Sequence, residues 1–245
     1  MQEPASDGAG GHNGVGVSSA NDATNGAMRR GRKGAQVSSK DDLIANIVQA
    51  EWEMFQKVPN VGRPAGCQQD PKTFEIMRSS QAASWSEAAL ESYLDDLVTA
   101  QRHGRNLLTE KYARMMASTA PAEYAALEPL LPVLDPTALH LIDAIVEVVL
   151  AWETDLSTKF PHVLQRGRPL HATEDRPGVT SVETYLRGEL ASYSLRTLKL
   201  YLDNVRVQEK EGVNGSELAL SQTVKRYGYE SLTAAEQRLA QRGRS

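Results

Sequence analysis

Apolar residues recur along most of this chain at the spacing that places side chains on one face of an α-helix. The segment 181–207 shows the pattern clearly, because ionisable residues border its apolar stripe on both sides. The stripe consists of Val182, Leu186, Leu190, Tyr193, Thr197 and Leu200. The same criterion predicts helices near 41–57, 72–82, 86–102, 105–118, 121–130, 136–158, 181–207, 217–226 and 233–242.

Helix start signals support this assignment. Capping boxes, in which a Ser or Thr and an acidic residue three positions later satisfy free helix amides, can be assigned in four places. They pair Ser39 with Asp42, Ser84 with Glu87, Thr180 with Glu183, and Thr233 with Glu236. Asp70-Pro71 and Asp135-Pro136 place Pro at the first helical position, where its missing amide costs nothing. Since alternating β-branched runs are absent, we expect an all-α protein of about eight to nine helices.

The first forty residues differ from the rest of the chain. Residues 1–40 hold eight of the 18 glycines and no aromatic residue. Such a segment cannot bury enough apolar surface to offset its ordering entropy. The sequence therefore predicts a disordered tail over 1–40 and a single helical domain over 41–245, with the strongly apolar 136–158 as its central helix.

Charge and cysteine content narrow the function classes. The net charge is −4, and because the tail has five basic against three acidic residues, the body is more acidic still. An acidic body argues against an extended nucleic-acid interface. The single cysteine excludes an internal disulfide framework and a multi-cysteine zinc site, and no motif identifies a metal or a cofactor. Without a long apolar run or a signal peptide, we expect a soluble cytoplasmic protein with no membrane contact.

A short basic run at 29–33, RRGRK, makes the nucleus an alternative cellular location. Such runs serve as nuclear import signals or as arms that bind nucleic acid. Four charges in five residues form an unspecific signal, so nucleic-acid binding is expected only through this tail.

Three charged blocks carry the candidate chemistry, and the first is the predicted helix after Asp70. Arg78 and Gln81 share a face, with Glu75 three positions before Arg78. The functional interpretation is an arginine held by Glu75 so that its planar fork binds a carboxylate or phosphate. The alternative is a surface ion pair of small energetic value.

The second block is GRNLLTEKYARMM, residues 104–116. Arg105 and Asn106 at the expected helix start could join free amides in binding an anion, while Glu110 and Arg114 are spaced as an i,i+4 pair. Glu before Arg at this spacing is equally typical of a stabilised, exposed helix.

The third block is TSVETYLRGEL, residues 180–190. Glu183 is explained by its capping box, whereas Tyr185, Arg187 and Glu189 are not. Arg187 and Glu189 lie on opposite shoulders of the helix, so each should meet a partner from another helix. The partners that we expect for them are Arg78, Glu110 and Arg114.

Cys67 lies in a Gly- and Pro-containing loop beside Arg63, where a lowered pKa would make its thiolate a nucleophile. No histidine can be assigned as its base. The alternative is a structural thiol.

Together with GRPAGCQQD at 62–70 and FEIMRSSQ at 74–81, the second and third blocks resemble the signature blocks of an uncharacterised protein family, a domain of unknown function of bacteria and some filamentous fungi. The resemblance covers roughly residues 45–205, and Pro64 and Gly66 depart from the family pattern. It implies no reaction, fold or cofactor. For fungal members it points to specialised-metabolite clusters of the loline-alkaloid type.

The leading expectation is an enzyme or small-molecule-binding protein of specialised metabolism, with an internal pocket lined by Arg and Glu for an anionic, for example amino-acid-like, substrate. The substrate-binding candidates are Arg78, Gln81, Arg105, Asn106, Arg114, Tyr185 and Arg187, and the catalytic candidates are Glu110, Glu189 and Cys67. The alternatives are a nuclear regulatory protein with a basic import arm, or a helical scaffold whose charged blocks lie scattered on its surface.

Overall fold

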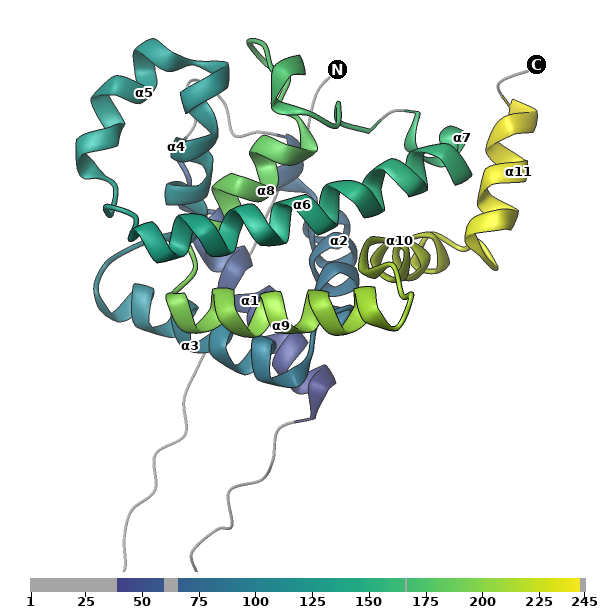
Figure 1. The fold of residues 1–245 in the computed structure, drawn as a ribbon, viewed down its shortest axis with the longest axis horizontal. Coiled ribbons are helices and arrows are strands. Elements are labelled where there is room, and N and C mark those ends of the chain that lie inside the picture. The colour runs from purple at the N-terminus through teal and green to yellow at the C-terminus, as the bar shows by residue number, and fades with distance from the viewer. Residues whose placement is uncertain (1–38, 60–65, 166, 243–245) are drawn as a thin grey trace, which may run out of the picture. The chain divides into compact units, whose positions relative to one another are not determined.

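Amphipathic helices form nearly all of the structure. The computed structural model describes residues 39–59, 66–165 and 167–242, which contain eleven α-helices, three short 3₁₀ turns and no β-strand (Figure 1). The prediction of an all-α fold is confirmed, whereas the expected number of eight to nine helices was too low. The tail predicted over 1–40, including the basic run at 29–33, lies outside the described residues except for its last two positions.

The first part of the chain forms a group of helices around α1. The elements are α1 (Lys40–Phe55), η1 (Gly66–Gln69), α2 (Pro71–Ala83), α3 (Glu87–Arg102), α4 (Leu107–Thr119), α5 (Pro121–Leu127) and η2 (Glu128–Leu130). Helix α1 packs against α2, α3 and α4, and its buried face includes Leu43, Ile47 and Met54. The Ser39–Asp42 capping box and the Asp70-Pro71 start are present as predicted.

The second part of the chain is arranged around the long helix α6. Its elements are α6 (Pro136–Lys159), α7 (Pro161–Leu164), η3 (Ala172–Glu174), α8 (Val182–Leu190), α9 (Leu195–Lys210), α10 (Gly215–Arg226) and α11 (Leu232–Arg242). Helix α6 contacts α7, α8, α9 and α10, and it runs beside α9 in Figure 1. These contacts on several sides explain its high apolar content.

The single helix predicted over 181–207 was wrong, because the chain forms two helices, α8 and α9, separated by residues 191–194. Ser194 starts the second helix by accepting a hydrogen bond from the Thr197 amide, and its own amide donates to Asp96 at 2.9 Å. Helix α8 packs on α4, whereas α9 packs on α3 and α6. The apolar stripe therefore serves two different interfaces.

Three of the predicted capping boxes were also wrong. The hydroxyls that accept from amides at the starts of α3, α8 and α11 belong to Ser86, Ser181 and Ser231. Two of the acidic partners bind backbone amides of other segments: Glu183 accepts from the Ala172 amide, and Glu236 accepts from the amides of His162 and Val163 at the start of α7. These two carboxylates therefore fix neighbouring segments instead of capping their own helix.

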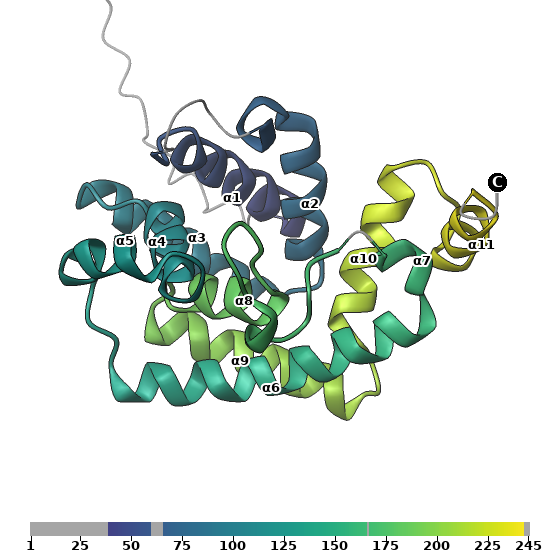
Figure 2. The same ribbon diagram turned by 90° about the horizontal axis from the view of Figure 1, so that it is seen from above.

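Two apolar cores support this arrangement. The large core extends over α1, α2, α3, α4, α6, α8 and α9. A small one, with Val224, Leu232 and Ala235 at its centre, joins α7, α10 and α11, which lie together on one side in Figure 2. Within the described residues, no helix combines the length and apolar character needed to cross a membrane.

Candidate functional site

Four helices each contribute one charged side chain to a buried group that we call the ionic cluster: Glu51 of α1, Arg78 of α2, Lys111 of α4 and Glu189 of α8. Arg78 donates from Nε to Glu51 Oε2 at 2.7 Å, and from Nη2 to Glu51 Oε1 and, at 2.8 Å, to Glu189 Oε1. Lys111 Nζ donates to Glu189 Oε2 at 2.7 Å. The exposed fraction of these side chains does not exceed 13 %. Acid and base thus alternate along the cluster.

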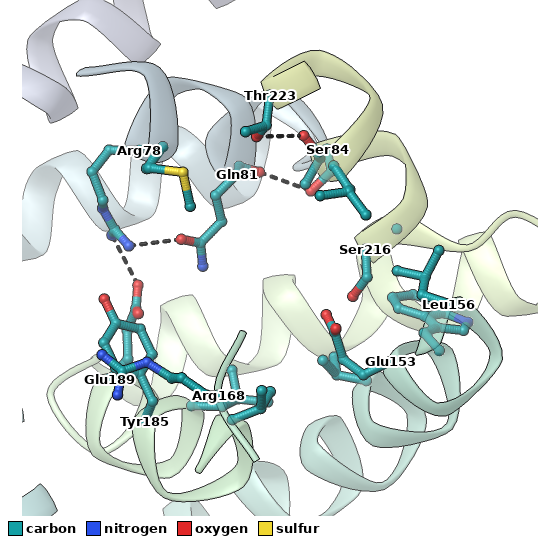
Figure 3. Close-up of a pocket in the computed structure, with 18 of the residues that line it drawn as sticks. Arg78, Gln81, Ser84, Glu153, Leu156, Arg168, Tyr185, Glu189, Ser216 and Thr223 are labelled. Atoms are coloured by element: carbon teal, nitrogen blue, oxygen red, sulfur yellow. Dashed lines mark hydrogen bonds and ion pairs between the residues drawn. The ribbon is translucent and has the colours of Figure 1, made fainter. Parts of the chain in front are cut away.

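Hydroxyl and amide groups complete its hydrogen bonding. Tyr93 of α3 donates to Glu51 Oε1 at 2.7 Å, and Tyr193 donates to Glu189 Oε1 at 2.9 Å. Gln81 accepts from Arg78 Nη1 at 2.7 Å (Figure 3). Burial, reinforced by the carboxylates, raises the pKa of both tyrosines, so both remain protonated donors.

The cluster balances its own charge. Burial alone would raise the pKa of Glu189, but Arg78 and Lys111 hold it well below its usual range. Removing ions from water costs several kcal/mol each, so this mutual pairing is what makes their burial tolerable. Four of the five guanidinium N–H groups of Arg78 donate to Glu51, Gln81 and Glu189. Most donors of Arg78 are therefore engaged inside the cluster, and the cluster as a whole is close to neutral.

Gly188 explains how α8 reaches α4. A β-carbon at this position would lie 2.9 Å from the Lys111 carbonyl oxygen and 2.9 Å from Met115 Cγ. Because glycine has none, the two helices approach closely and Glu189 meets Lys111.

A pocket of about 510 Å³ adjoins the cluster, which is within the range of small-molecule sites, roughly 300 to 1,000 Å³. Arg78, Gln81, Tyr185 and Glu189 line one side of it (Figure 3). Apolar lining comes from several helices, with Phe74, Val149, Trp152, Leu156, Leu186 and Leu220. The pocket thus combines an apolar interior with a few polar groups.

Two charged residues that do not belong to the cluster also line this pocket, Glu153 of α6 and Arg168 of the segment between α7 and α8. The Arg168 guanidinium lies 4.7 Å from the centre of the Tyr185 ring, and its Nη1 donates to the Thr180 carbonyl at 3.0 Å. Partial burial raises the pKa of Glu153, an effect that Ser216 partly offsets by hydrogen bonding. Neither Glu153 nor Arg168 forms an ion pair with another described residue.

Of the sequence candidates, the structure brings Arg78, Gln81, Tyr185 and Glu189 together. The expected Arg78–Glu189 partnership is present, but the second carboxylate on Arg78 comes from Glu51 rather than Glu75. Glu75 is exposed and forms no ion pair within the described residues.

The four candidates of the second block do not line the pocket, although Tyr112 of the same block does. Glu110 forms a bidentate ion pair with Arg105, whose Nε and Nη2 donate to its two carboxylate oxygens at 2.8 and 2.7 Å, instead of an i,i+4 pair with Arg114. Asn106 caps α4 and also donates to the Met54 carbonyl at 2.7 Å, which ties α4 to α1. Arg114 donates to the Pro132 carbonyl at 2.6 Å.

Arg187 also lies outside the pocket lining. Arg187 pairs with Asp143 of α6 at 2.6 Å and with Glu183 at 3.1 Å, so its partner is not one of the three expected residues. Cys67 falls in η1, and its side chain lies outside what the structure describes. The described residues contain no group of three or more His, Cys, Asp or Glu placed to hold a metal ion.

Sequence reasoning missed Glu51, Lys111, Glu153 and Arg168. For Glu51 a signal existed, because it continues the apolar spacing of Leu43 and Ile47 along α1 and so occupies a core position. A charge at such a position requires a buried partner. Arg168 lies in the polar loop 165–178 between two helices, a context in which functional residues are common, but nothing in the loop distinguishes it from its neighbours. No comparable local signal marks Glu153, because its importance depends on the pocket.

Fold and site together define an all-helical protein with a pocket of ligand size beside a buried ionic cluster. The family model described as protein of unknown function (DUF4125) matches residues 41–237, and the chain belongs to this family. No curated protein and no solved structure matches the chain.

Proposed function

We propose that the protein binds a small organic anion with an apolar body in the pocket between α2, α6, α8 and α10. The observation that carries this proposal is Arg168, a cation at the pocket that forms no ion pair with a described carboxylate. Its contacts with Tyr185 and with the Thr180 carbonyl position the guanidinium and leave donors for a ligand. A planar guanidinium matches the two oxygens of a carboxylate.

The ionic cluster supports this binding mode indirectly. Since Arg78 donates four of its five N–H groups to Glu51, Gln81 and Glu189, we assign it to the pocket wall and Arg168 to the ligand. Lys111 contacts the same Tyr185 ring, with Nζ 3.6 Å from the ring centre, and so helps to hold it in place. A wall with fixed side chains binds more tightly than one that must become ordered on binding.

The catalytic roles of Glu110, Glu189 and Cys67 stay predictions. A carboxylate whose pKa is lowered, such as Glu189, is a weak general base, which favours binding over acid–base chemistry at this residue. For the biological setting we propose specialised metabolism, as the family resemblance implies. Metabolite profiling of a deletion strain tests this setting, and an unchanged metabolite profile would contradict it.

Octanoate is a suitable probe because it combines a carboxylate with an apolar chain. We expect Arg168→Gln to weaken octanoate binding about tenfold or more, since it removes a charge-assisted hydrogen bond. Isothermal titration calorimetry measures the change. Arg176→Gln is the matched control, because Arg176, like Arg168, is an exposed arginine of the same segment, but it does not line the pocket. Equal affinity of the Arg168 and Arg176 variants for octanoate would refute the role of Arg168.

A further inference from the structure

Glu153 is a carboxylic acid placed where the pocket is otherwise mainly apolar. It lies on α6 between Val149 and Leu156, both of which line the pocket, and its side chain is half-buried. Figure 3 shows its carboxyl group directed toward the pocket interior and toward Ser216 of α10. A carboxylate at such a position is costly unless a cation or donors compensate it.

The groups that face Glu153 provide donors but no paired cation. Ser216 comes from α10, and Tyr201 of α9 also lines the pocket near it. Arg78 pairs with Glu51 and Glu189, and Arg168 forms no ion pair with Glu153. Ser216 therefore compensates a charged Glu153 only in part, and a cationic group of a ligand could provide the rest.

We propose that Glu153, assisted by the Ser216 hydroxyl, binds a protonated amine of the ligand. This inference rests on the proposed function, since it concerns the same pocket. The carboxylate accepts from the ammonium, Ser216 offers a further acceptor, and the Trp152 and Tyr201 rings that line the pocket provide aromatic surface of the kind that attracts cations. No metal-binding group of three or more suitable residues competes for this role in the described part of the chain.

An amine site at Glu153 would narrow the ligand class from any small organic anion to one that also carries an amine. With an ammonium at Glu153 and a carboxylate at Arg168, the ligand is a zwitterion with an apolar body between its charged ends. The apolar lining, including Val149, Leu156 and Leu220, then contacts that body. Because the ionic cluster is close to neutral, it repels neither end.

Four probes with the same eight-carbon chain separate the contributions: octanol, octanoate, octylamine and 8-aminooctanoate. We expect octylamine to bind the full chain at least about tenfold more tightly than octanol, and 8-aminooctanoate to bind most tightly. Glu153→Gln should remove the preference for octylamine over octanol while leaving octanol affinity unchanged. Glu147→Gln is the matched control, because Glu147 is an exposed acid of the same helix outside the pocket.

The affinities of the four probes test the amine site at Glu153 and the anion site at Arg168 separately. If octylamine binds no better than octanol, the amine site is refuted, while octanoate binding would still support the proposed function. If none of the four probes binds, both proposals fail. Octanol affinity reports whether the pocket of the Glu153 variant is intact, and if that variant does not fold, the comparison of octylamine with octanol on the unmodified chain still decides. Equal weakening of octylamine by the Glu147 and Glu153 variants would also refute the amine site.

Discussion

Arg78 shows at the scale of a single residue how packing defines the role of a charge. Its own helix offers Glu75 at i−3, yet its partners are Glu51 and Glu189 from two other helices. Pairing with other helices is favoured over pairing with Glu75, because the buried carboxylates need a cation, whereas the exposed Glu75 is solvated by water. The residue was identifiable from the sequence, but its partners were not.

Glu51 is the residue with the largest expected effect on stability. Glu51→Gln leaves Arg78 and Tyr93 without their charged acceptor, and breaking a buried pair from one side costs about 3 to 5 kcal/mol. Urea denaturation measures this loss in the free energy of unfolding. Glu53→Gln, two positions later on the exposed side of α1, should change it by less than about 0.5 kcal/mol. Similar losses in both variants would show that the cluster contributes little to stability.

At the scale of the elements, the starts of helices were predictable where a cap acts within its own turn. Ser39 and Asp70 cap their helices as their sequence signals indicate. The break between α8 and α9 was missed although Ser194 caps α9 within its own turn, because residues on both sides keep the same apolar spacing. The two helices then pack differently, α8 mainly on α4 and α9 on α3 and α6.

The α4–α8 contact depends on the absence of a side chain at Gly188. We expect Gly188→Ala to destabilise the protein by about 1 to 3 kcal/mol, because the new methyl group would meet the Lys111 backbone oxygen, which cannot move without its helix. Thermal unfolding followed by circular dichroism measures the effect. Gly215→Ala provides a comparison: its nearest neighbours are side-chain atoms of Gln208 and Trp152, so a smaller loss is expected. A Gly188 variant as stable as the parent protein would contradict the close approach.

At the scale of the whole molecule, the stability of the fold depends on several carboxylates being ionised. Burial alone would raise the pKa of Glu189, but its cationic partners lower it overall, and hydrogen bonding, first from the Ala172 amide, lowers the pKa of Glu183. An acid with a lowered folded-state pKa stabilises the fold above its ordinary value of 4.5 and loses this contribution as the pH falls further. We therefore expect the free energy of unfolding to decrease steadily below about pH 4.5, as measured by urea denaturation across pH.

The contribution of Glu153 to stability should depend on pH in the opposite sense to that of Glu189 and Glu183, because burial raises the pKa of Glu153. Its contribution is present at low pH and is lost as the pH rises from 4.5 through the raised value. In the same denaturation series, Glu153→Gln should therefore be at least as stable as the parent protein at neutral pH and retain the acid-induced loss. A stability that is independent of pH below 4.5 in both proteins would contradict the role of the paired carboxylates.

The sequence by itself determined the all-α class, most helix positions and two of the residues in the cluster, Arg78 and Glu189. These features follow from interactions within about four residues along the chain, which a helical period and a capping side chain express directly. Only the tertiary structure decided that Glu51 and Lys111 complete the cluster, and that Glu153 and Arg168 line the same pocket. The physical reason is that a buried charge takes its partner from whichever helix packs beside it, and that packing is fixed by contacts between segments far apart in the chain.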